Sequence, residues 1–510
     1  MTEKPRSAHD VDAVLAYLEA VVEDRGLLAD LDEATRQRFL MAAGRVSRPD
    51  RAAMRDLAKA FRKKEKEERK RHDAELLGET GIRRLRSLPV FETPPPPTGT
   101  RTLPSEEAGP ELREARKCYV CKREFTKVHP FYDQMCPECG DFNFAKRTQT
   151  ADLRGRTALV TGARVKIGYQ ASILLLRAGC RVIATTRFPH DAALRYAREA
   201  DFHEWKDRLV VHGLDLRHTP SVELFAKHLE SVEERLDFVI HNACQTVRRP
   251  SGFYAHLVER EREPLDALPA EARSLLDAHD DLRARRGLAL AEASAGLGLS
   301  SASLGKAAGL VDAPGLSQLE LLDEDRLRGG AIFPEGELDA DLQQVDRRER
   351  NSWRMTLAEV PTVELLEVQL VNAIAPFVLN ARLKPLMLRH RTDDKHIVNV
   401  SAMEGQFYRD HKTDKHPHTN MAKAALNMMT RTSAADYVKD GIHMNSVDTG
   451  WVTDEDPVEL AARKVEEHGF HPPLDIVDGA ARIVDPIFSG FLTGTHPWGL
   501  FLKDYKPVPW

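Results

Sequence analysis

Residues 155–179 read GRTALVTGARVKIGYQASILLLRAG, and this stretch decides the fold. A short run rich in Val and Leu leads into a turn that contains Gly162 and Gly168, and an apolar stretch with helical spacing follows. Such a turn presents backbone N–H groups and the start of a helix to a ligand, which suits the negative charge of a pyrophosphate. The stretch therefore predicts the first strand, turn and helix of a dinucleotide-binding domain.

Further apolar runs rich in Val and Ile follow along the chain, separated by longer amphipathic segments. They are CRVIATT at 180–186, RLVVHGLDL at 208–216, LDFVIHNA at 236–243 and HIVNVSA at 396–402. Nearly continuous apolar strands with helical crossovers indicate a parallel sheet that is covered on both faces. We expect a doubly wound α/β domain over residues 151–510.

One region interrupts this alternation. Residues 249–360 lie between the fourth strand and the next helix, and their middle is rich in Ala, Gly, Leu and Ser without clean periodicity. A structureless loop of this size is uncommon inside a compact domain. The insertion is either a helical cap over the site or a partly disordered segment.

The chain before the α/β domain divides into two parts of different composition. Residues 1–91 carry apolar side chains at helical spacing and predict two or three helices. Residues 92–110, ETPPPPTGTRTLPSEEAGP, contain four consecutive prolines that cannot continue a helix. We expect a semi-rigid linker there.

Four cysteines form two close pairs within residues 111–150. The pattern is C-x2-C-x14-C-x2-C, with Cys118, Cys121, Cys136 and Cys139. Two C-x2-C turns can bring four thiolates to one tetrahedral zinc ion, which then has no open position for water. We therefore predict a structural zinc module. Its CPECG segment resembles the knuckle of a zinc ribbon, in which the glycine, here Gly140, relieves the turn beneath the metal; two local disulfides are the alternative.

Composition limits the class of protein. The 74 basic and 79 acidic residues give a net charge of −5, which favours neither nucleic acid nor a membrane surface as a partner. No run of about 20 apolar residues and no secretory signal is present. Together with the paired cysteines, these features predict an intracellular, cytoplasmic protein.

The glycine-bearing turn resembles the Thr-Gly-x-x-x-Gly-x-Gly motif of the short-chain dehydrogenase/reductase family. Gly162, Ile167 and Gly168 match the motif, whereas Lys166 occupies its middle glycine. A lysine there either crowds the cofactor or turns outward and adds its charge beside a phosphate. Arg164 is a second cation of the turn; it either contributes to binding an anion or faces solvent.

Further matches follow in the family's order along residues 153–505. They are Asp215 and Leu216 beside the adenine, Asn242 and Ala243 after the fourth strand, the helix asparagine Asn372, and Gly450 and Val452 over the nicotinamide. The resemblance implies that these residues bind the cofactor or support catalysis. Arg187 follows the second strand, where a cation would neutralise a 2′-phosphate, so NADP is favoured over NAD unless this arginine merely caps the strand.

The family's catalytic residues are only partly present. Lys423 matches the catalytic lysine, but Thr419 stands where the family has tyrosine, and Ala402 replaces the serine next to Ser401. An aliphatic hydroxyl is a far weaker acid than a phenol of pKa about 10. His418, beside the vacated position, is a candidate proton donor; otherwise it is a loop histidine without a role. Tyr408, in the preceding loop, is another candidate.

These patterns predict an NADP-linked oxidoreductase with an altered proton donor, acting on a small-molecule carbonyl or alcohol that the sequence does not identify. The alternative is a non-catalytic dinucleotide-binding protein that contacts a protein partner through its zinc module or N-terminal helices. The family resemblance also implies a homodimer formed through the helices that carry Asn372 and Lys423.

Overall fold

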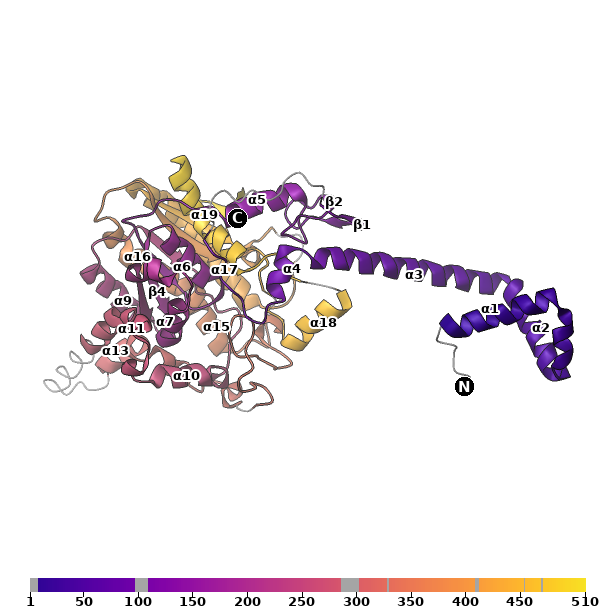
Figure 1. Ribbon diagram of the computed structural model, residues 1–510. Helices are drawn as coiled ribbons and strands as arrows, with labels where there is room; N and C mark the ends of the chain where they lie inside the picture. The colour runs from indigo at the N-terminus through magenta and orange to yellow at the C-terminus, as the bar shows by residue number, and fades with distance from the viewer. Residues whose placement is uncertain are drawn as a thin grey trace. The chain divides into compact units, whose positions relative to one another are not determined.

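The computed structural model describes residues 8–96, 109–285, 302–327, 330–408, 412–453, 455–468 and 471–510 (Figure 1). Its contacts divide the chain into two compact units, residues 1–75 and 76–510. The division falls within one long helix, α3 (Arg51–Gly78). It therefore lies earlier in the chain than the predicted linker.

The first unit is helical. It contains α1 (Ala8–Glu23), the 3-10 turn η1 (Arg25–Asp30), α2 (Glu33–Ser47) and most of α3. The Asp32 carboxylate accepts a hydrogen bond from the Thr35 N–H at 2.9 Å, which starts α2. A fourth helix, α4 (Gly81–Arg86), belongs to the second unit, so this part of the sequence forms one helix more than the upper number predicted.

Thr93 and Pro94, at the beginning of the predicted linker, form hydrogen bonds with side chains of the α/β domain. The Thr93 hydroxyl donates to Glu199 at 2.8 Å, and the Arg177 guanidinium donates to the Pro94 carbonyl at 2.9 Å. These residues are therefore held by side chains of the larger unit. Residues 97–108 of the linker lie outside the described residues.

The larger unit is built on an eight-stranded sheet. In the order β10-β9-β8-β7-β6-β3-β4-β5, all neighbouring strands are parallel except β10 and β9. The strands are β3 (Thr157–Thr161), β4 (Arg181–Thr186), β5 (Leu209–Gly213), β6 (Phe238–His241), β7 (Lys395–Ser401), β8 (Ile442–Asp448), β9 (Phe501–Lys503) and β10 (Lys506–Val508). This confirms the predicted doubly wound α/β fold and its five strands.

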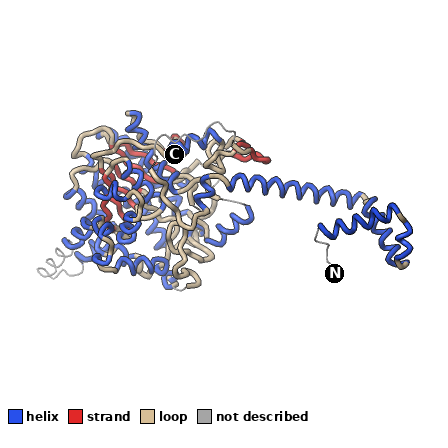
Figure 2. Tube along the Cα trace, viewed as in Figure 1, coloured by secondary structure: helices blue, strands red, loops and turns tan. Residues whose placement is uncertain are grey.

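Helices cover both faces of the sheet (Figure 2). Alternate strand residues point to opposite faces, so Ala158 and Val160 of β3 join one core cluster while Leu159 joins the other. The first face is covered mainly by α6 (Lys166–Arg177), α7 (Pro189–Ala197) and α19 (Ile476–Thr493). The second is covered by α9 (Thr219–Val232), α16 (Ala375–Met387) and α17 (Pro417–Tyr437).

The described part of the insertion forms short helices rather than an extended loop. These are α10 (Ala255–Arg262), α11 (Ala270–Ser274), α13 (Ala302–Val311) and α14 (Ala313–Leu316), with the 3-10 turns η3 (Ser251–Tyr254), η4 (Leu265–Ala267), η5 (Asp323–Arg326) and η6 (Ser352–Arg354). Residues 286–301 and 328–329, which include much of the Ala- and Gly-rich stretch, lie outside the described residues.

Further short elements complete the α/β domain. They are α8 (Phe202–Trp205), η2 (Lys206–Arg208), α15 (Thr362–Gln369), the π-helical η7 (Leu370–Ile374), η8 (Met403–Gly405), η9 (Val438–Asp440) and α18 (Val458–His468). A π-helical turn within a longer helix is rare and is found frequently at functional sites.

The cysteine-rich segment is joined closely to the α/β domain. It consists of the antiparallel pair β1 (Glu111–Lys117) and β2 (Glu124–Lys127), followed by α5 (Pro137–Arg147). Arg147, at the end of α5, makes two hydrogen bonds of 2.5 and 2.8 Å to the Asp475 carboxylate at the start of α19. The Tyr132 hydroxyl donates to Asp478 at 2.6 Å. The module therefore packs as part of the larger unit.

Among the described residues, one helical stretch, Thr362–Met387, is long and apolar enough to cross a membrane by length and composition alone. It spans α15, η7 and α16. Leu379, Leu383 and Leu386 of this stretch are buried in the core beneath the sheet. Packing in this core accounts for much of its apolar character.

Candidate dinucleotide site and metal centre

A cavity of about 470 Å³ lies at the carboxyl ends of β3, β4, β5 and β6. The order of connection reverses between β3 and β6, and ligands of doubly wound sheets bind at such a switch point. The cavity wall contains most of the predicted cofactor residues: Gly162, Arg164, Lys166, Ile167, Gly168, Arg187, Asp215, Leu216, Asn242 and Ala243.

The two glycines of the turn are required by close backbone packing. Gly162 has φ +68°, and a Cβ there would lie 2.7 Å from the Ala243 Cα. A Cβ on Gly168 would lie 2.1 Å from the Asn242 Nδ2. Asn242 donates from this atom to the carbonyl oxygens of Thr161 and Gly162, at 3.2 and 3.1 Å. The structure thus brings together four residues that the sequence places in separate motifs.

Lys166 keeps the backbone conformation that a glycine would adopt. Its φ is +56°, in the left-handed region that costs a residue with a Cβ roughly 1–2 kcal/mol. The Nζ lies 4.0 Å from the Asp341 carboxylate in the insertion. The lysine side chain therefore turns toward the insertion; a position of its charge beside a phosphate stays a prediction.

Arg164 is buried and engaged in an internal ion pair. It donates to Asp191 at 2.7 Å and to the Gln343 side chain at 3.4 Å. Burial lowers the pKa of the guanidinium, and the Asp191 charge opposes this effect. The interpretation as a solvent-facing charge is therefore wrong. Arg164 lines the cavity, and its contribution to binding an anion stays a prediction.

Arg187 is held in the cavity wall by hydroxyl groups of the insertion. It donates to the Tyr254 hydroxyl at 2.9 Å and to the Ser317 hydroxyl at 3.3 Å, and it stacks on the Tyr254 ring at 4.8 Å. Burial raises the pKa of Tyr254, but the charges of Arg187, Arg217 and Arg249 outweigh burial and lower it overall. Arg187 is thus a residue of the cavity and not a simple strand cap.

Asp215 is buried beside the cavity and paired with Arg217. The Arg217 guanidinium donates to its carboxylate at 2.6 Å and to Glu367 at 3.1 Å. Burial raises the pKa of Asp215, but Arg217 outweighs this effect and lowers it, so the carboxylate is charged at neutral pH.

The insertion supplies a wall of the cavity that the sequence motifs did not identify. Its lining residues include Phe253, Tyr254, Gln343, Asp346, Arg348 and Asn351. Several lie in QQVDRRERN, residues 343–351, where polar residues replace the Ala- and Gly-rich composition of the preceding stretch. That change in composition is the sequence signal that could have identified these lining residues.

The predicted catalytic lysine and asparagine make contacts within the fold. Lys423 is buried, and its Nζ donates to the Val400 carbonyl at the end of β7, at 2.7 Å. The Asn372 side chain in η7 accepts from the Gln245 N–H at 2.8 Å and donates to the Gln245 carbonyl at 3.1 Å. Neither residue is among the described residues that line the cavity.

The candidate proton donors lie in different environments. Thr419 is buried, and its hydroxyl has no hydrogen-bond partner among the described residues. His418 is also buried, with its Nε2 3.7 Å from the Glu364 carboxylate of α15. Burial raises the pKa of Glu364, but its interactions with His418 and Ser352 lower it overall. Tyr408 is 88% exposed and does not fold back toward Thr419.

The predicted nicotinamide loop packs against the cysteine-rich module. Gly450 has φ +78°, and the next N–H, of Trp451, donates to the Tyr119 hydroxyl at 3.1 Å. Val452 is buried in a cluster that includes Cys118 and Cys136. Tyr119 and Trp451 are 332 positions apart, so no sequence motif could indicate this contact.

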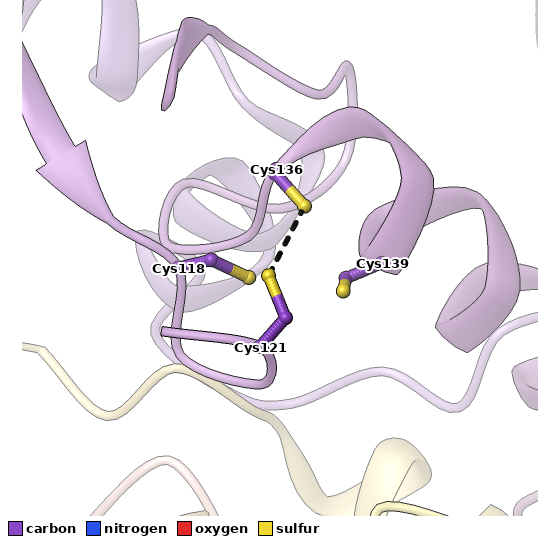
Figure 3. Close-up of side chains that lie close together, drawn as sticks. All are labelled: Cys118, Cys121, Cys136 and Cys139. Atoms are coloured by element: carbon purple, nitrogen blue, oxygen red, sulfur yellow. Dashed lines mark hydrogen bonds between the residues drawn. The ribbon is translucent and has the colours of Figure 1, made fainter. Parts of the chain in front are cut away.

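The four cysteines converge on one point (Figure 3). Cys118 and Cys121 follow β1, Cys136 precedes α5, and Cys139 lies in its first turn. All four Sγ atoms lie within 4.8 Å of one another, and the Cys121–Cys136 distance is 3.8 Å. A tetrahedral zinc with Zn–S bonds of about 2.3 Å has S–S edges of about 3.8 Å. The residues therefore fit zinc, and no disulfide joins these described cysteines.

The predicted role of Gly140 is wrong. This glycine lies inside α5, and a Cβ there would lie 2.4 Å from the His129 ring, so it makes room for that side chain. Lys122, after the first cysteine pair, has φ +63° and makes the tight turn instead. Its N–H donates to the Cys118 carbonyl at 3.0 Å.

Comparison with known proteins places this arrangement in a family. A family model described as enoyl-(acyl carrier protein) reductase matches residues 349–468. The bovine dehydrogenase/reductase SDR family member 13 is 39% identical over 107 residues, 20% of this chain and 27% of that protein. Human retinol dehydrogenase 11 is 32% identical over 114 residues, 22% of this chain and 36% of that protein. The chain thus aligns with about a third or less of the length of these two relatives.

A longer match and a structural match extend the comparison. The uncharacterized protein R665 of Acanthamoeba polyphaga mimivirus is 31% identical over 409 residues, which is 77% of this chain and 74% of that protein. The Pseudomonas aeruginosa RhlG/NADP active-site complex is 17% identical, with a TM-score of 0.41 over 69% of this chain and 95% of that one.

The chain belongs to the short-chain dehydrogenase/reductase family. Its strand order and the position of its glycine turn agree with that membership. The family consists of nicotinamide-dependent oxidoreductases.

Substitution of Cys118 and Cys121 by serine should release zinc, because two of the four thiolates are lost. We expect zinc content, measured by metal analysis of the purified protein, to fall from about one ion per chain to near zero. Cys244→Ser is the matched control, since this exposed cysteine lies outside the module. Unchanged zinc in the double variant would contradict the assignment.

Proposed function

We propose that the protein is an NADP-dependent oxidoreductase that transfers a hydride between the nicotinamide and a carbonyl or alcohol group of a small molecule. The observation that carries this proposal is the position of Arg187 in the wall of the cavity formed around Gly162 and Gly168. NADP supplies the hydride chemistry when bound; the protein supplies binding, orientation and the proton.

The cavity fits the two charged parts of the cofactor. The turn at 162–168 offers backbone N–H groups and the start of α6 to a pyrophosphate. Asp215 and Leu216 stand where the adenine would bind. Arg187 is hydrogen bonded to two hydroxyls, so its guanidinium is oriented to bind a 2′-phosphate. NAD lacks that phosphate, which makes it the weaker ligand.

Substitution of Arg187 by alanine should remove the preference for NADPH. We expect NADPH to bind about tenfold or more weakly, since one charged hydrogen bond is worth about 1.5–3 kcal/mol, while NADH binding changes little. Fluorescence titration of the zinc-loaded protein measures both affinities. Arg154→Ala is the control, because Arg154 is an exposed arginine paired with Asp152. Equal wild-type affinity for the two cofactors would overturn the NADP assignment.

The proton step is assigned to the first turn of α17. The Thr419 hydroxyl stands in the position of the family's tyrosine, one helical turn before Lys423, and would hydrogen bond the substrate oxygen. We assign the proton to His418, because an imidazole can act as a general acid and an aliphatic hydroxyl is a far weaker one. Glu364 stabilises the imidazolium from 3.7 Å. In the reductive direction the hydride goes to the carbonyl carbon and this proton to its oxygen.

Substitution of His418 by asparagine should lower kcat by about 100-fold, while NADPH affinity stays unchanged. His416→Asn is the matched control: His416 has φ +41°, a conformation that asparagine tolerates. Steady-state rates with a panel of carbonyl compounds measure the effect. An unchanged kcat in the His418 variant would exclude it as the donor.

A second candidate function is a non-catalytic dinucleotide-binding protein that contacts a protein partner. Two observations favour it. None of Lys423, His418 and Tyr408 lines the described cavity. The N-terminal unit leaves large apolar side chains exposed, among them Val14, Leu40, Met41, Leu57 and Phe61. NADPH binding without turnover on any carbonyl compound would support this candidate over the enzyme.

A second copy of the chain is the proposed partner of the larger unit. The helices carrying Asn372 and Lys423 expose Leu366, Ile374, Phe377, Met421 and Met428. We expect light scattering to give the mass of a dimer, and Phe377→Glu to give a monomer because it places a charge in the interface. Leu357→Glu, at a 76% exposed position elsewhere, is the control. A monomeric wild type would contradict the proposal.

A further inference from the structure

A residue of the cysteine-rich module holds the loop after β8. Tyr119 lies between Cys118 and Cys121, and its hydroxyl accepts from the Trp451 N–H at 3.1 Å. The Trp451 carbonyl accepts from the Leu474 N–H at 3.3 Å. One residue of the loop is thus held by the module on one side and by the segment leading to α19 on the other.

The loop has little space to take another position. A Cβ on Gly450 would lie 3.0 Å from the Tyr119 oxygen and 2.4 Å from Leu474. The Gly450 N–H donates to Asp448 at 2.7 Å, and the other oxygen of that carboxylate accepts from the Met403 N–H at 2.7 Å. Asp448 therefore joins the loops that follow β7 and β8. Within this arrangement, Tyr119 is the contact that comes from the module.

Tyr119 is itself held firmly on the module side. Its N–H donates to the Gln134 carbonyl at 2.8 Å, and its ring lies beneath the Lys503 ammonium at 5.6 Å. Tyr119 lies between Cys118 and Cys121, two of the predicted metal ligands. When the turn between these cysteines is ordered, the position of the Tyr119 hydroxyl is fixed.

We infer that Tyr119 is a positioning residue that sets the loop 449–453 against the nicotinamide half of the cofactor. The inference rests on the proposed NADP-dependent function. The adenosine half would contact Arg187, whose hydrogen bonds go to Tyr254 and Ser317 of the insertion and not to the cysteine-rich module. Loss of the Tyr119 hydroxyl therefore weakens binding of the nicotinamide half and leaves binding of the adenosine half intact.

The test compares two ligands on the zinc-loaded, full-length protein. Tyr119→Phe removes the hydroxyl and keeps the ring. NADPH should bind about threefold to tenfold more weakly to this variant, the effect of one neutral hydrogen bond, while adenosine 2′,5′-bisphosphate binds unchanged. Tyr437→Phe is the matched control, because its buried hydroxyl donates to the Asn380 carbonyl at 3.0 Å, away from the loop. It should affect neither ligand.

Equal weakening of both ligands, or no change in either, would overturn the inference. Hydrogen exchange of the ligand-free protein provides a second measurement. Peptides covering 449–453 should exchange faster in Tyr119→Phe than in wild type or Tyr437→Phe; equal exchange would also overturn it. If wild type binds neither NADPH nor the bisphosphate, the proposed cofactor is wrong, and the exchange rates alone then decide whether Tyr119 holds the loop.

Discussion

The ion pair between Arg147 and Asp475 joins the cysteine-rich module to the α/β domain. Both side chains are buried, and the guanidinium also lies 3.1 Å from Asp478. Asp475 at the same time accepts hydrogen bonds from the Val477 and Asp478 N–H groups, which begins α19. Removing the arginine would leave two carboxylates buried without their cation, a costly state. One contact thus joins α5 of the cysteine module to α19.

The cavity wall is built in two ways. The part around Gly162 and Gly168 arises from adjacent segments, a strand, a turn and a helix, whose glycines allow the close approach of Asn242 and Ala243. The insertion then closes over it through buried charges: Arg248 makes two hydrogen bonds to Asp325, at 2.6 and 2.8 Å, and a third to Glu367 of α15. Because α15 continues toward Asn372, the insertion is anchored to the helix that carries the predicted catalytic asparagine.

Two buried hydroxyl groups at or beside the predicted catalytic positions lack hydrogen-bond partners among the described residues. They belong to Ser401 and Thr419. Each such group costs about 1–3 kcal/mol, and unsatisfied groups of this kind occur where a ligand or water completes the site. Family membership supplies the fold but not the reaction, which depends on how this region accommodates a substrate.

Local patterns in the sequence were enough to predict several elements of the fold. Five strands, the turn at 162–168 and the spacing of the four paired cysteines were predicted because apolar runs, glycines and cysteine pairs act over a few residues. The sequence did not reveal β8, in which His443 and Asn445 interrupt the apolar run, nor the burial of Arg164 against Asp191. The contact between Tyr119 and Trp451 and the wall formed by the insertion became visible only in the folded chain, because both depend on packing between segments that are far apart in the sequence.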